Sequence, residues 1–129
     1  CVGRIVKILN RERKAVNGSK ILVLGVAYKR DVSDTRESPA VDIIRLLEND
    51  GGAVDYHDPY VPELATDQAF GSPAKRSVAL TPEAVAGYDL VVLTTDHSAV
   101  DYDMVRSSAR LIFDTRNAYK GRYENVVKL

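Results

Sequence analysis

An uninterrupted apolar run at residues 21–24, followed by a charged segment, constrains the fold of this chain more than any other feature. An apolar run without alternation is typical of a parallel strand that is covered on both faces. After the charged segment, Ser38 suits a helix cap and Pro39 suits the first helical position, where a missing N–H costs nothing. The order strand, charged loop, helix places the loop at the carboxyl end of the strand, where open α/β sheets bind ligands.

The rest of the chain alternates between strand and helix patterns. Helical spacing predicts helices at 2–14 and from residue 39 to the pair Gly51-Gly52, which can end a helix in a left-handed conformation. A helix start at 81–83 and a helical segment at 101–109 are also predicted. Further strands are predicted at 54–57, 78–80, 90–94 and 111–113, and 63–76 is expected to be a loop with a helical turn. Right-handed crossovers should then give a single-domain, three-layer, mostly parallel, doubly wound Rossmann-like α/β sheet.

Composition excludes several classes of partner. The 129 residues suffice for one domain, and the 18 Lys and Arg residues equal the 18 Asp and Glu residues. With no net charge, no overall field attracts nucleic acid or an anionic membrane surface. No apolar run approaches the length of a membrane span, and the charged amphipathic start is unlike a signal peptide. We therefore expect a cytoplasmic location, and a start at Cys1, the single cysteine, suggests a fragment.

The charged segment carries cations where a dinucleotide-binding loop carries glycines. A dinucleotide fingerprint needs Gly-x-Gly-x-x-Gly directly after the first strand, and only Gly25 is present here. Lys29, Arg30 and Arg36 supply positive charge instead, so an anionic ligand would be bound by side chains. The structural alternatives are a solvated surface Lys29 and an ion pair between Arg36 and a neighbouring carboxylate.

Arg116 and two His–Asp pairs also follow predicted strands. Because Arg116 comes directly after strand 111–113, its side chain is expected at the same carboxyl edge as Lys29, with a structural salt bridge to Asp114 as the alternative. For the pairs His57-Asp58 and Asp96-His97, a role in a turn, loop or helix cap is favoured over acid–base catalysis. Neither histidine has the Cys or His neighbours of a structural zinc site, and no metal is expected.

Three separated motifs carry a family resemblance. The first is Gly-x-Ala-aromatic-Lys followed by Arg-Glu-Ser, matched by Gly25, Ala27, Tyr28, Lys29, Arg36, Glu37 and Ser38. The others are Tyr-His-Asp-Pro at 56–59 and Asp-Thr-Arg-Asn at 114–117. In this order they resemble the C-terminal, UDP-binding domain of the UDP-glucose/GDP-mannose dehydrogenase family. The amino-acid sequence of the first motif most resembles that of the bacterial UDP-N-acetyl-hexosamine 6-dehydrogenases.

The resemblance implies part of an NAD-dependent oxidoreductase that oxidises the C6 alcohol of a nucleotide sugar to a carboxylate, in polysaccharide biosynthesis. It implies that Lys29 and Arg116 contact the UDP-sugar and that Tyr28 helps to wall the pocket. It places Arg36 on the NAD side of the cleft, with NAD bound mainly by an N-terminal domain of the parent chain. The family's catalytic cysteine lies upstream, and Cys1 lacks its sequence context. No catalytic residue is therefore assigned, and the chain alone is expected to be inactive.

The resemblance also predicts the organisation of the chain. Residues 1–17 are expected to be the end of a helix that joins domains and carries homodimer contacts, although covering one sheet face is an equally good role. Residues 18–129 would form the UDP-binding domain. The alternative function is a stand-alone α/β interaction or regulatory module whose charged loop binds a protein partner or another anionic ligand. Convergence of Lys29, Arg36 and Arg116 on one edge would favour the nucleotide-sugar site, and the missing glycines disfavour a free-standing Rossmann dehydrogenase.

Overall fold

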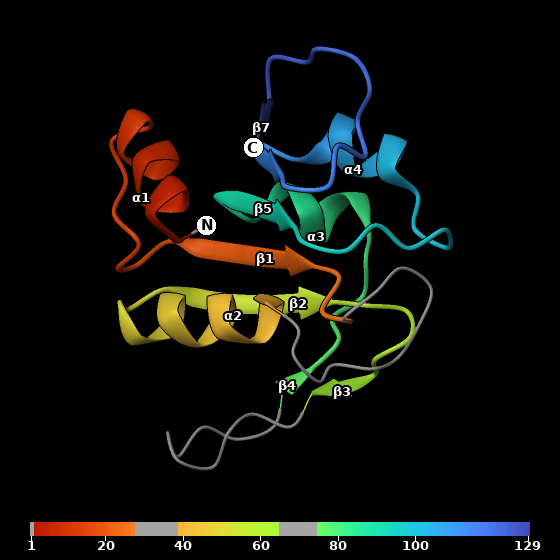
Figure 1. Ribbon diagram of the computed structural model, residues 1–129, viewed down its shortest axis with the longest axis horizontal. Coiled ribbons are helices and arrows are strands. Elements are labelled where there is room, and N and C mark those ends of the chain that lie inside the picture. The colour runs from red at the N-terminus through yellow and green to blue at the C-terminus, as the bar shows by residue number, and fades with distance from the viewer. Residues whose placement is uncertain (1, 28–38, 65–74) are drawn as a thin grey trace.

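The computed structural model describes residues 2–27, 39–64 and 75–129, which form four helices and seven strands (Figure 1). The helices are α1 (Val2–Arg11), α2 (Pro39–Asn49), α3 (Pro82–Ala86) and α4 (Tyr102–Ser108). The strands are β1 (Lys20–Leu24), β2 (Ala53–His57), β3 (Glu63–Leu64), β4 (Lys75–Arg76), β5 (Leu90–Leu93), β6 (Ile112–Asp114) and β7 (Val126–Lys128).

Five strands form one parallel sheet in the order β2-β1-β5-β6-β7. The interior strand β1 pairs with β2 on one side, where Ile21 is opposite Val54, and with β5 on the other, where Ile21 is opposite Leu90. The chain therefore moves outward from β1 to β2 and then returns to the opposite side of β1. This reversal of direction between β1 and β5 is the switch point at which open α/β sheets bind ligands.

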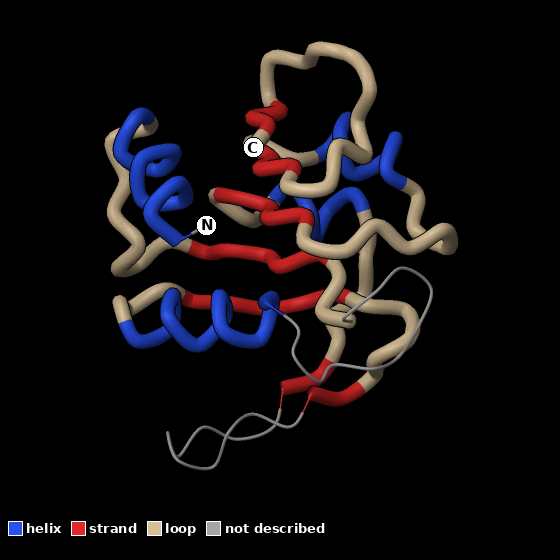
Figure 2. The backbone as a smooth tube through the Cα atoms, viewed as in Figure 1, coloured by secondary structure: helices blue, strands red, loops and turns tan. Residues whose placement is uncertain are grey.

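Helices cover both faces of this sheet (Figure 2). Alternation along β1 sends Ile21 and Val23 into one buried cluster, which includes side chains of α1 and α2. Leu22 and Leu24 enter a second cluster with side chains from α3 and α4. Both faces of β1 are thus buried, which is why its sequence is apolar without interruption. The predicted three-layer, parallel α/β fold is confirmed.

Helix α1 belongs to the core of this domain. Its Ile5, Ile8 and Leu9 are at most 3% exposed and pack in the same cluster as α2. This helix therefore covers one face of the sheet, which is one of the two roles expected for residues 1–17. A contact with another domain or with a second copy of the chain stays a prediction.

Three segments differ from the sequence-based expectation. Residues 78–80 are not a strand, although the Val78 N–H donates to the Tyr56 carbonyl at 2.9 Å. Strand β7 was not predicted, because its sequence Val-Val-Lys has neither an uninterrupted apolar run nor an alternating pattern. In 63–76, the described residues form the short antiparallel pair β3-β4 rather than a helical turn, and 65–74 lie outside the described residues.

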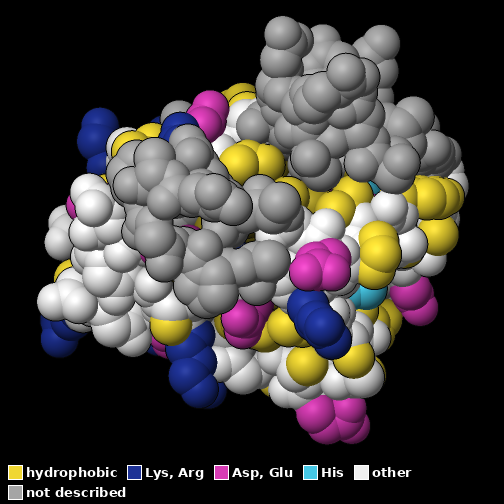
Figure 3. Space-filling model, turned by 90° about the horizontal axis from the view of Figure 1, so that it is seen from below, with side chains coloured by type: hydrophobic (Ala, Val, Ile, Leu, Met, Phe, Trp, Pro, Cys, Tyr) yellow, Lys and Arg dark blue, Asp and Glu magenta, His cyan; other side chains and the backbone are white. Residues whose placement is uncertain are grey.

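Charges of both signs share the surface. Figure 3 shows one face of the molecule. Where grey atoms do not cover it, Lys and Arg side chains are interspersed with Asp, Glu and apolar side chains, in keeping with the balanced composition. Within the described part of the chain, the longest helix has 11 residues, and none is long and apolar enough to cross a membrane.

Tyr56 gives the fold a predicted sensitivity to alkali. Burial, with the Asp58 and Glu63 carboxylates nearby, raises its pKa from 10.0 to about 12. Because the pKa is higher in the folded state, the associated stability is present below pH 10 and is lost as the pH rises toward about 12. We expect the free energy of unfolding, measured with urea, to fall across this range.

The variant Tyr56→Phe isolates this contribution. It removes the titrating hydroxyl together with its hydrogen bond to the Val61 carbonyl at 2.9 Å. The alkaline loss of stability should become smaller but should not vanish, because burial also raises the pKa values of Tyr88 and Tyr119. An unchanged slope of stability against pH in Tyr56→Phe would contradict the assignment.

Candidate nucleotide-binding site

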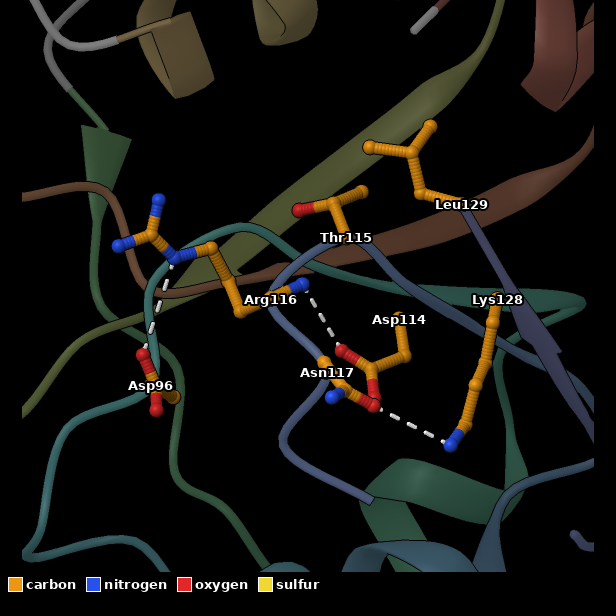
Figure 4. Close-up of a pocket in the computed structure, with 7 residues that line it drawn as sticks. All are labelled: Asp96, Asp114, Thr115, Arg116, Asn117, Lys128 and Leu129. Atoms are coloured by element: carbon orange, nitrogen blue, oxygen red, sulfur yellow. Dashed lines mark hydrogen bonds and ion pairs between the residues drawn. The ribbon is translucent and has the colours of Figure 1, made fainter. Parts of the chain in front are cut away.

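A pocket of about 590 Å³ lies at the carboxyl edge of the sheet, and Arg116 is part of its wall (Figure 4). Its lining comes from the ends of three neighbouring strands: Asp96 follows β5, Asp114–Asn117 end and follow β6, and Lys128 ends β7 with Leu129 after it. Parallel strands bring these ends to one edge, as the position of Arg116 after strand 111–113 predicted.

The buried carboxylate of Asp114 shapes the turn that carries Arg116. Asp114 is 1% exposed and accepts hydrogen bonds from the backbone N–H groups of Arg116 (2.9 Å), Ala118 (3.2 Å) and Tyr119 (3.0 Å). Between them, Asn117 has a left-handed φ of 56°, a conformation that asparagine adopts more readily than most residues. The backbone at Arg116 is therefore fixed while its side chain, 48% exposed, faces the pocket.

Replacing Asp114 with asparagine should destabilise the protein. The amide keeps the shape of the carboxylate but presents an N–H₂ group to backbone donors, so at least one buried N–H loses its acceptor. We expect the free energy of unfolding to fall by about 1–3 kcal/mol. Asp42→Asn is the control, because Asp42 is 65% exposed in its ion pair with Arg45 and such pairs contribute at most about 1 kcal/mol. Equal losses in urea unfolding would contradict this role of Asp114.

Two of the residues that line the pocket, Arg116 and Lys128, have positively charged side chains. Arg116 Nε lies 3.8 Å from Asp96 Oδ1, and Lys128 Nζ donates to Asn117 Oδ1 at 3.2 Å. The side-chain salt bridge of Arg116 is thus to Asp96 rather than to Asp114, which bonds the Arg116 backbone instead. A guanidinium held by one long ion pair has a planar set of N–H donors suited to a phosphate or a carboxylate.

The ends of β1 and β5 are tied together beside this pocket. Gly25, with a φ of +87°, packs against Thr95, and the Thr94 hydroxyl donates to the Gly25 carbonyl. The Thr95 hydroxyl donates to the Ala27 carbonyl at 2.8 Å. The chain therefore leaves β1 along a path fixed by β5, and Tyr28 and Lys29 follow in the sequence.

The histidines have structural partners that sequence reasoning did not identify. His57 Nδ1 lies 2.7 Å from the Val78 carbonyl, which only accepts, so this nitrogen is the donor. His97 is fully buried with its Nε2 2.8 Å from Asp58 Oδ2. Both histidines are thus bonded within the protein, and their interpretation as structural residues rather than acid–base catalysts stays a prediction. The signal for the Asp58–His97 pair was that both residues follow strands ending at one edge.

Of the predicted site residues, the structure places Arg116 alone. Tyr28, Lys29 and Arg36 lie outside the described residues, as does Cys1, so their convergence with Arg116 on one edge stays a prediction. In the ranges 2–27, 39–64 and 75–129, no group of three or more His, Cys, Asp and Glu side chains is arranged to hold a metal ion.

The five-stranded parallel sheet with helices on both faces defines a Rossmann-like α/β domain, and comparison with known proteins identifies its family. Residues 22–121 match the model of the UDP-glucose/GDP-mannose dehydrogenase family, UDP binding domain. The match covers most of the chain, which therefore belongs to this family.

Curated relatives and solved structures agree with this assignment. The chain is 34% identical over 110 residues to a UDP-glucose 6-dehydrogenase of Rhizobium meliloti, covering 81% of this chain and 24% of that protein. It is 31% identical over 106 residues to a UDP-N-acetyl-D-mannosamine dehydrogenase of Methanococcus maripaludis, covering 76% and 22%. The structure of the UDP-D-ManNAc dehydrogenase of Pyrococcus horikoshii matches with a TM-score of 0.74 at 27% identity, over 98% of this chain and 28% of that one. The chain thus spans about a quarter of the length of these relatives.

Proposed function

We propose that this chain is the nucleotide-sugar-binding domain of an NAD-dependent UDP-sugar 6-dehydrogenase, an oxidoreductase that converts the C6 alcohol of the sugar to a carboxylate. The observation that carries the proposal is the placement of Arg116 in a pocket at the carboxyl edge of the parallel sheet. The family membership supports UDP as the ligand. Relatives named for UDP-glucose and for UDP-N-acetyl-D-mannosamine both match, and the motif at 25–38 favours a UDP-N-acetyl-hexosamine.

In this proposal, the diphosphate is bound by side chains. Arg116 presents its guanidinium to the phosphate oxygens, and the backbone hydrogen bonds of Asp114 hold the turn in place before the ligand arrives. Lys29 adds a second charge-assisted contact and Tyr28 an aromatic wall. Each such contact to a phosphate contributes about 1.5–3 kcal/mol.

The described residues do not form a dinucleotide site of the glycine-rich type. In such a site the backbone N–H groups after the first strand bind the pyrophosphate. Here the N–H groups of Val26 and Ala27 donate to the Asp58 carboxylate at 2.8 and 3.1 Å and are engaged within the protein. We therefore propose that NAD binds mainly to an N-terminal domain of the parent chain, with Arg36 as the contact from this domain.

The organisation of the parent enzyme follows the same proposal. Residues 18–129 are the UDP-binding domain, and residues 1–17 lead from the N-terminal, NAD-binding domain while α1 also covers the sheet. The parent is proposed to be a homodimer in the cytoplasm. Because the catalytic cysteine of the family belongs to the N-terminal part, this chain supplies binding and no catalytic residue.

Titration of the chain with UDP tests the proposal. We expect UDP to bind weakly but measurably in a calorimeter, because the Arg116 and Lys29 contacts remain while the other half of the cleft is missing. Uridine, which lacks the phosphates, should bind at least about tenfold more weakly. No NADH should form when NAD and UDP-sugars are added. Equal responses to UDP and uridine, or turnover in proportion to the chain, would contradict the proposal.

A further inference from the structure

A buried carboxylate–imidazole pair lies beside the proposed site without being part of its pocket lining. Asp58 follows β2 and His97 follows β5, and they are 1% and 0% exposed. His97 Nε2 lies 2.8 Å from Asp58 Oδ2, and because an ionised carboxylate only accepts, the imidazole is the donor. The Tyr60 ring packs edge-on against His97 with its centroid 4.8 Å away. The imidazole is thus held in one orientation.

Three backbone N–H groups complete the shell of the same carboxylate. Asp58 Oδ2 accepts from Val26 (2.8 Å) and Ala27 (3.1 Å), and Oδ1 accepts from Tyr60 (2.8 Å). Val26 and Ala27 are the residues by which the chain leaves β1. Two consecutive N–H groups bonded to one oxygen fix the orientation of both peptide planes, and hence the backbone of Val26 and Ala27 at the exit of β1.

The same pair connects to the Arg116 side of the pocket. Asp96 pairs with Arg116 at 3.8 Å. Because Asp96 directly precedes His97 in the sequence, the position of the buried His97 restricts where the Asp96 backbone can lie. One residue earlier, the Thr95 hydroxyl donates to the Ala27 carbonyl at 2.8 Å. Hydrogen bonds therefore connect the exit of β1 to Asp58 and His97, and the peptide bond between His97 and Asp96 connects these to the residue that pairs with Arg116.

We propose that Asp58 and His97 are positioning residues of the nucleotide-sugar site, which hold the exit of β1 and the loop after β5 in the relative arrangement that UDP requires. The inference rests on the proposed function and goes beyond it, because neither side chain is proposed to contact UDP. A carboxylate elsewhere shows what a structural role alone looks like. Asp89 lies at the amino end of β5, the end opposite the pocket. It accepts hydrogen bonds from Lys14 Nζ (2.6 Å) and from the Lys20 N–H (2.8 Å), and so connects the amino ends of β1 and β5.

The test compares four variants of this chain by NMR titration with UDP, which reports affinity and folding in one measurement. His97→Leu removes the donor while the three backbone hydrogen bonds of Asp58 remain, and Asp58→Asn replaces an acceptor oxygen by a donor. Both should weaken UDP binding by about tenfold. His97→Gln restores an N–H donor and should bind within about threefold of the wild type. Asp89→Asn should lower the melting temperature without changing the affinity for UDP.

The outcomes separate positioning from general stability. A folded His97→Leu that binds UDP as tightly as the wild type overturns the inference and leaves the proposed function intact. An Asp89→Asn that weakens binding as much as His97→Leu overturns it as well, because loss of stability would then suffice. A wild-type chain that binds no UDP overturns the proposed function, and the inference with it. If Asp58→Asn does not fold, the comparison of His97→Leu with His97→Gln decides.

Discussion

Replacing Gly25 with alanine should destabilise the protein by about 2–5 kcal/mol, because two costs add at this position. The first is the φ of +87°, which side chains of L-residues rarely adopt. The second is a collision, because a Cβ built on Gly25 would lie 2.3 Å from the Thr95 carbonyl oxygen and 2.9 Å from the Thr95 nitrogen. These are backbone atoms, so no side-chain rotation relieves the contact. The ends of β1 and β5 would have to separate at the switch point of the sheet.

Gly18→Ala is the matched control. Gly18 has a nearly equal φ of +85°, but no atom lies within 4 Å of a Cβ built on it. It therefore carries the conformational cost alone, about 1–2 kcal/mol. Urea unfolding of the two variants, at equal pH and temperature, gives the difference. If Gly18→Ala and Gly25→Ala lost the same stability, the close approach of the strand ends would not be a constraint.

The architecture could be predicted because burial on two faces leaves a direct mark on sequence. Residues 21–24 and 90–93 are apolar without interruption, and they form β1 and β5, whose side chains are buried on both faces of the sheet. Strand β7 left no such mark. It is an edge strand, paired with β6 alone, and its residues are all only half-buried.

The site was predictable in part for the same reason. Arg116 could be assigned to the carboxyl edge because it follows a strand, and a parallel sheet collects its strand ends. For Asp58 and His97 the same logic gives a common edge but not their hydrogen bond, because the two residues lie 39 positions apart and the other donors to Asp58 are backbone N–H groups, which every residue type has. Asp114 presents the same difficulty, since its three partners are all backbone.

Arg116→Ala should weaken the binding of UDP by about tenfold to hundredfold, the loss of one charge-assisted contact to a phosphate. The fold should be retained, because the side chain is 48% exposed and its ion pair with Asp96 is 3.8 Å long. Arg110→Ala is a close control. Arg110 is 62% exposed and pairs with Asp89 at the same distance of 3.8 Å, but at the amino end of β5. Removing it should leave the affinity for UDP unchanged, as calorimetric titration of both variants will show.

In the proposed parent enzyme, the same reasoning separates the UDP-sugar from NAD. Lys29→Ala and Arg116→Ala should raise the Michaelis constant for the UDP-sugar, whereas Arg36→Ala should impair the use of NAD more than that of the sugar nucleotide. The reason is that, in the sequence, Lys29 comes shortly after β1 while Arg36 comes shortly before α2, so we expect the two cations to serve different ligands. Steady-state kinetics with each ligand varied in turn, together with thermal melts, measure this split. The same defect in all three variants would contradict this prediction. So would an unchanged specificity constant for NAD in Arg36→Ala, because Arg36 would then not contribute to NAD binding.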